Sequence, residues 1–136
     1  MNTAQRPAVL ALDPGRSKCG LAVVDESGAP LYRAIVSCEG CEKVAAELVA
    51  RYRIVCVVLG NGTGSAMMRQ VVARAAPNVP IEAVDESHTS EVARARRVAE
   101  ERHGWKRLVP AGLLTPSSPY DDLVAVVLAE RWWRTR

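Results

Sequence analysis

Carboxylates stand at three places in this sequence where an apolar segment begins or ends. Such side chains repel one another when crowded, and their pKa values rise unless a cation neutralises them. Oxygen ligands of this kind hold Mg²⁺ or Mn²⁺. If the fold brings the three places together, the sequence predicts a metal site. The residues are Asp13, Asp85 with Glu86, and Asp121 with Asp122.

The first part of the sequence indicates which elements would hold the first acid. Residues 8–13 form an apolar run that ends in an aspartate, as expected for a strand covered on both faces. Residues 19–25 and 31–37 are two further strand candidates, separated by the turn-forming stretch DESGAP. Three strands joined by short turns predict an antiparallel meander.

Helix and strand alternate in the rest of the sequence. Alternation of this kind predicts parallel strands joined by right-handed crossovers, and therefore an α/β fold. The hydrophobic spacing predicts a helix over 41–52, a strand over 54–60, a helix over 65–75, a strand over 81–85, a long helix from Thr89 and a last helix over 120–133.

A parallel sheet would bring the acids to one edge. Asp13 would lie at the carboxyl end of the central strand, where open α/β sheets place their sites. Asp85 and Glu86 end a parallel strand and would share that edge. The last helix is apolar all round after its first turn, so it must pack inside and would carry Asp121 or Asp122 there.

Each acid also has a purely structural interpretation. Acids at a helix start are often caps, and this applies to both pairs. Asp13 differs, because a carboxylate that ends a buried strand needs a partner. Arg16 or Lys18 in the following loop could form an ion pair with it instead of a metal ion.

Length and composition restrict the class of protein. The 136 residues are the usual size of one domain, taken here as residues 1–136. A chain with 49% hydrophobic and 24% charged residues is typical of a globular protein, and no apolar run is long enough to span a bilayer. We expect no membrane association. The start of the sequence lacks a signal-peptide pattern, which predicts a cytoplasmic protein with reduced thiols.

Basic residues gather in one segment although the net charge is only +3. They could contact nucleic-acid phosphates, or they could form a solvated helix face with ion pairs at i,i+3 and i,i+4. The sequence leaves both interpretations open. The candidate phosphate contacts in this segment are Arg94, Arg97, Lys106 and Arg107.

A glycine-rich loop, GNGTGS at residues 60–65, follows the predicted strand over 54–60. Its backbone N–H groups could bind a phosphate at a helix N-terminus, with Asn61 and Thr63 beside them. The glycines could equally supply only a tight turn. The three tryptophans could stack on unpaired bases, but packing against the sheet is the preferred interpretation for Trp132.

The four cysteines include one CxxC pair, Cys38 and Cys41. Structural zinc would need two further ligands. Cys19 and Cys56 lie in apolar runs, where a cysteine behaves as a small buried hydrophobe. A turn that contains two thiols is therefore preferred to zinc or a redox pair.

Three stretches resemble motifs of the YqgF/RuvX family, which groups Holliday junction resolvases and ribosomal-RNA-processing nucleases of the ribonuclease H superfamily. LALDPGRSKCGLAVVD resembles the first motif, and its DPG spelling also resembles the related RuvC resolvases. DESHTSEVA is similar to the second motif, and YDDLVAVVLAERWW to the closing helix. The resemblance implies a ribonuclease H-like fold: a five-stranded mixed sheet with one antiparallel strand, flanked by helices.

The resemblance also implies roles for the acids. Asp13 corresponds to the first catalytic carboxylate. Glu86 corresponds to the acid of the second motif, with Asp85 beside it. Asp121 corresponds to the last, and Asp122 is the spare. The implied reaction is hydrolysis of a phosphodiester bond by two Mg²⁺ or Mn²⁺ ions, bridged by a carboxylate such as Asp13.

The implied partner is nucleic acid, either Holliday junction DNA or a ribosomal RNA precursor. Arg16 or Lys18 could hold the scissile phosphate, and a homodimer would place two active sites on a symmetric junction. The family usually has Arg-Leu where Ser87 and His88 stand here, so one expected positive charge is missing. Two alternatives are a nucleic-acid-binding protein that has lost efficient catalysis, and an actin-like ATPase, which normally needs two such domains.

Overall fold

The elements of the chain follow the predicted order. A computed structural model describes residues 6–62, 64–102 and 119–136. The elements are β1 (Pro7–Pro14), β2 (Lys18–Asp25), β3 (Pro30–Ser37), α1 (Cys41–Arg51), β4 (Arg53–Gly60), α2 (Ser65–Ala75), β5 (Ile81–Val84), α3 (Thr89–Glu101) and α4 (Asp121–Arg134).

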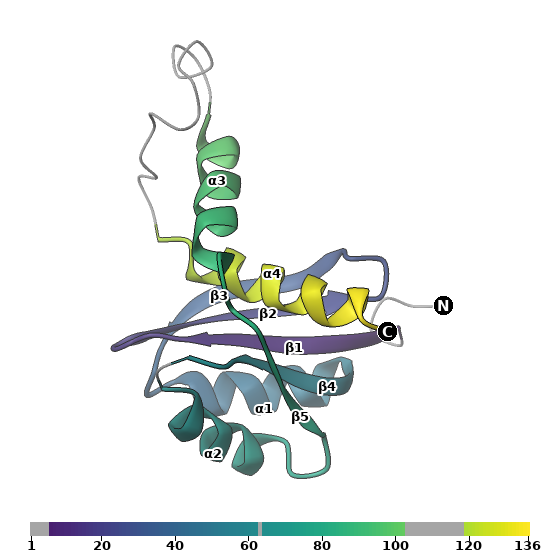
Figure 1. The fold of residues 1–136 in the computed structure, drawn as a ribbon. Coiled ribbons are helices and arrows are strands. Elements are labelled where there is room, and N and C mark those ends of the chain that lie inside the picture. Colours follow the sequence, from purple (N-terminus) through teal and green to yellow (C-terminus); the bar gives the residue numbers. More distant parts are fainter. Residues whose placement is uncertain (1–5, 63, 103–118) are drawn as a thin grey trace.

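The five strands form one mixed sheet in the order β3-β2-β1-β4-β5 (Figure 1). β2 is antiparallel to β1 and to β3, so the first three strands are the predicted meander. β4 is parallel to β1, and β5 is parallel to β4. The sheet therefore has a single antiparallel strand, β2, and the predicted α/β class and topology are confirmed.

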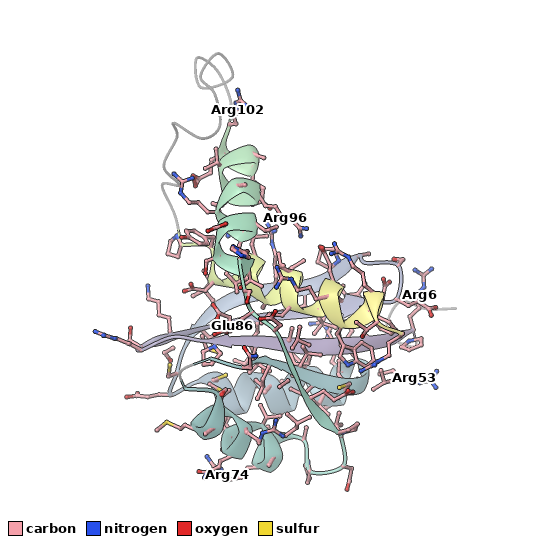
Figure 2. All side chains as sticks on the ribbon, in the orientation of Figure 1. Arg6, Arg53, Arg74, Glu86, Arg96 and Arg102 are labelled. Carbon is pink, nitrogen blue, oxygen red and sulfur yellow. The ribbon has the colours of Figure 1, made fainter. Side chains whose placement is uncertain are left out.

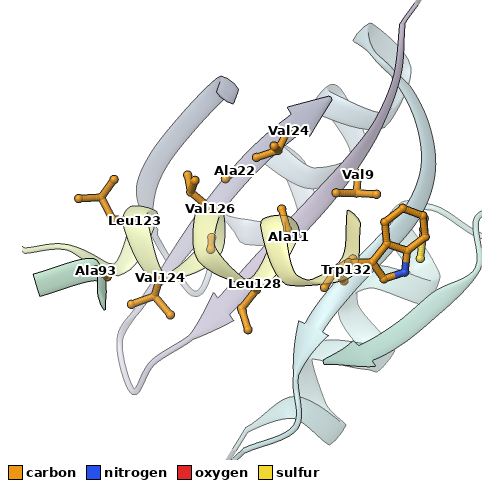
Figure 3. Close-up of a cluster of buried hydrophobic side chains, with 14 residues drawn as sticks. Val9, Ala11, Ala22, Val24, Ala93, Leu123, Val124, Val126, Leu128 and Trp132 are labelled. Carbon is orange, nitrogen blue, oxygen red and sulfur yellow. The ribbon is translucent and has the colours of Figure 1, made fainter. Parts of the chain in front are cut away.

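Side chains of the central strand alternate between two hydrophobic cores. Ala8, Leu10 and Leu12 face the layer formed by α1 and α2, whereas Val9 and Ala11 face α4 (Figure 3). All five side chains are fully buried. A strand covered on both faces reads as a continuous apolar run, which is why residues 8–12 show no alternation in sequence.

Helix α4 is the element that crosses the second face of the sheet. Residues 123–129 are all buried, and Trp132 farther along is only 8% exposed. The Trp132 indole donates a hydrogen bond from Nε1 to Glu82, at 3.1 Å, as expected for a tryptophan that packs against the sheet. In the described part of the chain, neither α4 nor another helix is long and apolar enough to cross a membrane.

Helix α3 stands away from the sheet and contacts the start of α4 (Figure 1). Arg96 of α3 forms an ion pair with Glu130 of α4, with Nη1 and Nη2 of the arginine directed at the two carboxylate oxygens. This contact fixes α3 to α4, and so fixes the turn before α3 relative to the sheet edge.

Candidate active site

Asp13 lies at the carboxyl end of β1, in the position that the sequence predicts for a site. Its neighbour in β2 is Gly20. A Cβ atom added to Gly20 would overlap the carbonyl of Asp121 and lie 2.8 Å from the backbone nitrogen of Asp122. The absence of a side chain at this position lets the start of α4 approach the end of β1.

Glu86 reaches the same edge through the turn between β5 and α3. The Glu86 carbonyl accepts a hydrogen bond from Thr89 Oγ1 at 2.7 Å and another from the Thr89 N–H at 3.1 Å. The carboxylate lies against the loop after β4. A Cβ atom at Gly62 would be 2.6 Å from Glu86 Cδ, and one at Gly60 would be 3.3 Å from it. Glycine at both positions leaves room for this carboxylate.

The carboxylates of Asp13, Glu86 and Asp121 come from distant parts of the chain but lie close enough to interact electrostatically. The pKa of Asp13 is raised to about 7, first because burial disfavours its ionised form and then because Asp121 and Glu86 repel its charge. Glu86 lies toward the opposite end of the sheet from Arg6 and Arg53, which mark the amino ends of β1 and β4 (Figure 2). The structure thus brings these three acids together at the carboxyl edge.

The other two predicted acids are held in different interactions. The Asp85 carboxylate is exposed and accepts hydrogen bonds from the Ser87 N–H at 3.0 Å and Ser87 Oγ at 2.7 Å. These bonds hold the pKa of Asp85 below its usual value. Asp122 is buried and pairs with Arg97 Nη2 at 2.7 Å and Arg33 Nε at 3.5 Å. Asp85 shapes a turn, and Asp122 anchors α4 to α3 and β3.

The basic residues that the sequence singles out fall into separate groups. Arg97 is committed to ion pairs, because besides Asp122 it contacts Glu100 at 2.8 Å. Of the two interpretations that the sequence left open, the structure therefore supports ion pairing for Arg97. Arg94 lies half-buried on the same helix. Lys106 and Arg107 lie outside the described residues, as does Thr63 of the glycine-rich loop.

We call the carboxyl edge of the sheet with Asp13, Glu86 and Asp121 the acidic edge. Two basic residues follow Asp13 closely in the sequence, around the turn between β1 and β2. Arg16 in this turn and Lys18, the first residue of β2, are both exposed. Among the described residues neither comes within ion-pair distance of Asp13, so the salt bridge considered from the sequence is not formed. Asn61, in the loop after β4, is also exposed. These three side chains are available to a ligand at this edge.

The donor atoms at the edge are suited to a hard divalent cation. Asp13, Glu86 and Asp121 supply carboxylate oxygens only, which is the ligand type that Mg²⁺ and Mn²⁺ prefer. A cation would also relieve the repulsion that raises the pKa of Asp13. As the side chains stand, no three His, Cys, Asp or Glu residues in the described ranges form a ready metal-binding cluster. The acids therefore fit such an ion in the chemistry of their ligand atoms, whereas their side-chain positions do not yet form a coordination site.

Sequence reasoning did not assign a role to Gly20, and it assigned a different one to the glycine-rich loop. The signal for Gly20 was present, because glycine inside a buried strand often marks the close approach of another backbone. The loop glycines were considered as a phosphate site or a tight turn. In the structure Gly60 and Gly62 make space for Glu86, a contact that no local pattern encodes.

Comparison with known protein sequences agrees with the three sequence motifs. Residues 7–103 match the family described as Tex protein YqgF-like domain. The chain is also 38% identical over 72 residues to Protein tex of Bordetella pertussis, an alignment that covers 47% of this chain and 9% of the relative. The chain thus spans less than a tenth of the length of that relative.

Solved structures with the same architecture include RuvC of Thermus thermophilus. One RuvC structure superposes with a TM-score of 0.58 at 22% identity, over 90% of each chain. A second, in complex with a Holliday junction substrate, superposes with a TM-score of 0.61 at 18% identity, over 96% of each chain. At this level of identity the likeness establishes a shared fold, and it confirms the predicted ribonuclease H-like architecture.

Proposed function

This chain belongs to the YqgF-like domain family, and from that premise and the acidic edge we propose that it is a metal-dependent nuclease. The reaction would be hydrolysis of phosphodiester bonds in structured or single-stranded nucleic acid. The observation that carries the proposal is the pKa of Asp13, which is raised to about 7 first by burial and then by repulsion from Asp121 and Glu86. Carboxylates kept in mutual repulsion are a common feature of functional sites.

Asp13, Glu86 and Asp121 would hold the divalent ion or pair of ions, Mg²⁺ or Mn²⁺. When bound at such a site, these ions activate a water molecule and stabilise the leaving oxygen of a phosphodiester. The chain itself supplies the placement of the ligands. Gly20 sets the approach of α4, and Thr89 and Gly62 set the position of Glu86. Asp13 must release its proton before it can act as a ligand, which ties ion binding to pH.

The proposed substrate follows from the exposed groups beside the acids and from the relatives. Arg16 lies in the exposed turn after Asp13 and Lys18 begins β2 directly after that turn, where both could hold a phosphate group. The RuvC of Thermus thermophilus was solved with a Holliday junction substrate, and a four-way junction is therefore the first DNA substrate to test. A ribosomal RNA precursor is the RNA candidate. A homodimer would present two such edges to a symmetric junction.

A second candidate function is nucleic-acid binding without efficient cleavage. Two observations favour it: the acids do not form a ready metal-binding cluster in the described part of the chain, and Ser87 and His88 replace the Arg-Leu usual in the second motif. Under this alternative the three acids would remain at the edge of the sheet without supporting efficient catalysis. Binding that persists without any metal-dependent cleavage would favour it.

The two candidates differ in a cleavage assay. Labelled single-stranded RNA, single-stranded DNA, duplex and four-way junction would be incubated with Mg²⁺ or Mn²⁺ and with the wild type, Asp13→Asn or Glu26→Gln. Glu26 is a matched control, because it is an exposed acid in the turn at the other end of β2. Cleavage by the wild type and Glu26→Gln but not by Asp13→Asn is the expected result. Equal cleavage by all three, or cleavage by none, would remove Asp13 from a catalytic role.

A further inference from the structure

Two buried thiols meet directly behind the acidic edge. Cys19 of β2 and Cys41, the first residue of α1, have their Sγ atoms 3.6 Å apart. Both side chains are fully buried. Met68 of α2 adds a third sulfur, with its Sδ 3.8 Å from Cys41 Sγ. We call Cys19 and Cys41 the thiol pair. It lies across the layer boundary between the sheet and the helices α1 and α2.

This pair differs from the one CxxC motif in the sequence. The third nearby thiol, Cys38, is half-buried, and its Sγ lies 3.5 Å from the Gly15 carbonyl. Cys38 is thus engaged with the turn between β1 and β2. The partner that the fold gives to Cys41 comes from 22 positions earlier in the chain. The fold therefore places Cys41 beside a thiol from outside its CxxC motif.

The two thiols of the pair are chemically unequal. The pKa of Cys41 is lowered by its hydrogen-bond contact with Cys19, which outweighs the opposing effect of burial. The pKa of Cys19 is raised by the same contact and by burial. Cys41 is therefore the thiol that ionises first and the better nucleophile. Cys41 is also the first residue of α1, whose N-terminus has no side-chain cap.

We propose that Cys19 and Cys41 form a reversible disulfide when the protein meets a peroxide. The Cys41 thiolate attacks one oxygen of hydrogen peroxide, the O–O bond breaks, and the released hydroxide takes a proton to become water. Cys19 then attacks the sulfur of the Cys41 sulfenic acid, the S–O bond breaks, and the hydroxide leaves with the Cys19 proton as a second water. Two thiols are oxidised and one peroxide is reduced. A dithiol reverses the bond by exchange.

The disulfide would act on the acidic edge through β2. Its sulfurs would be about 2.05 Å apart, so the two Sγ atoms must approach by about 1.5 Å, through rotation of the side chains or movement of β2 and α1. Cys19 directly precedes Gly20, which is the β2 partner of Asp13 and packs against the backbone of Asp121. A shift there changes the spacing of the carboxylates. This consequence rests on the proposed nuclease function, whereas the bond itself does not.

The disulfide can be mapped by proteolysis, because protease sites separate Cys41 from both of its candidate partners, Cys19 and Cys38. Folded protein would be treated with hydrogen peroxide, free thiols would be blocked, and the chain would be cut with trypsin and with a protease specific for glutamate. Cleavage after Glu39 places Cys38 and Cys41 on different peptides. We expect the peptide of Cys41 to be linked to that of Cys19 in the wild type and in Cys38→Ala. We expect no such link in Cys19→Ala or Cys41→Ala.

The functional readout uses the same samples. In the cleavage assay, peroxide should slow the wild type by about ten- to a hundred-fold, as expected for misplacement by about 1 Å, and a dithiol should restore it. Cys41→Ala should keep its activity in peroxide. The absence of a Cys19–Cys41 link, or a link from Cys38 instead, would overturn the proposal. A Cys19–Cys41 disulfide that leaves the cleavage rate unchanged would overturn the proposed effect on the acidic edge. If the disulfide forms but no form of the protein cleaves nucleic acid, the proposed disulfide stands and the proposed nuclease function does not.

Discussion

Replacing Asp13 with asparagine should make the ion-free protein more stable. Between about pH 4 and pH 7 the folded protein keeps the Asp13 proton, because its pKa is raised from 3.8 to about 7, whereas the unfolded chain has released it. The folded state then binds more protons than the unfolded state, so the contribution of Asp13 to stability falls as the pH rises through this window. Each tenfold change in proton affinity corresponds to about 1.4 kcal/mol, and ionised Asp13 therefore destabilises the fold by about 4 kcal/mol above pH 7.

Urea unfolding in the presence of a chelator measures this difference. Asp13→Asn should exceed the wild type in unfolding free energy by about 4 kcal/mol at pH 8 and by about 1 kcal/mol at pH 4.5. Glu26→Gln, the exposed control, should stay within about 0.5 kcal/mol of the wild type at both pH values. Added Mn²⁺ should stabilise the wild type more than Asp13→Asn, because the variant loses one negatively charged ligand of the ion. A stability difference between Asp13→Asn and the wild type that is no larger at pH 8 than at pH 4.5 would refute the raised pKa of Asp13.

Three further substitutions test the supports of the site. Gly62→Ala would put a Cβ against the Glu86 carboxylate, so metal-dependent cleavage should fall about ten-fold or more while the circular dichroism spectrum is unchanged. Gly20→Ala would overlap the backbone at the start of α4, and urea unfolding should show a loss of about 1–3 kcal/mol. Arg97→Met would leave a buried carboxylate of α4 without its closest partner, with an expected loss of about 3 kcal/mol. The exposed pair of Arg74 is the control, since Arg74→Met should change stability by less than about 1 kcal/mol.

The sequence predicts the elements well because each has a clear local pattern. The helix predicted over 41–52 is observed as Cys41–Arg51, and the last helix, predicted over 120–133, is Asp121–Arg134. Mostly apolar runs of five to seven residues between turn-forming stretches identify the strands, and alternation of strand and helix predicts parallel pairing. These features depend on neighbours in the chain, which is why a single sequence shows them.

Contacts between distant segments leave weaker traces in the sequence. The close approach of α4 to Gly20 depends on how the helix crosses the sheet, and the position of Glu86 depends on a loop about 25 residues before it. The pairing of Cys41 with Cys19 has the same origin, because both thiols are ordinary buried residues in their own segments. In each case a local pattern predicts burial but does not name the partner.

The sequence by itself determined the class of fold, the family and the set of acids from which a site could be built. The family resemblance assigns Glu86 and Asp121 to that site, but only the tertiary structure gives the physical reason why Asp121 and not Asp122 acts on Asp13. Successive residues on a helix point about 100° apart, so Asp121 and Asp122 must diverge, and the packing of α3 and β3 draws Asp122 into ion pairs with Arg97 and Arg33. Asp121 is left to act on Asp13. Local pattern determines what a residue can do, and packing determines what it meets.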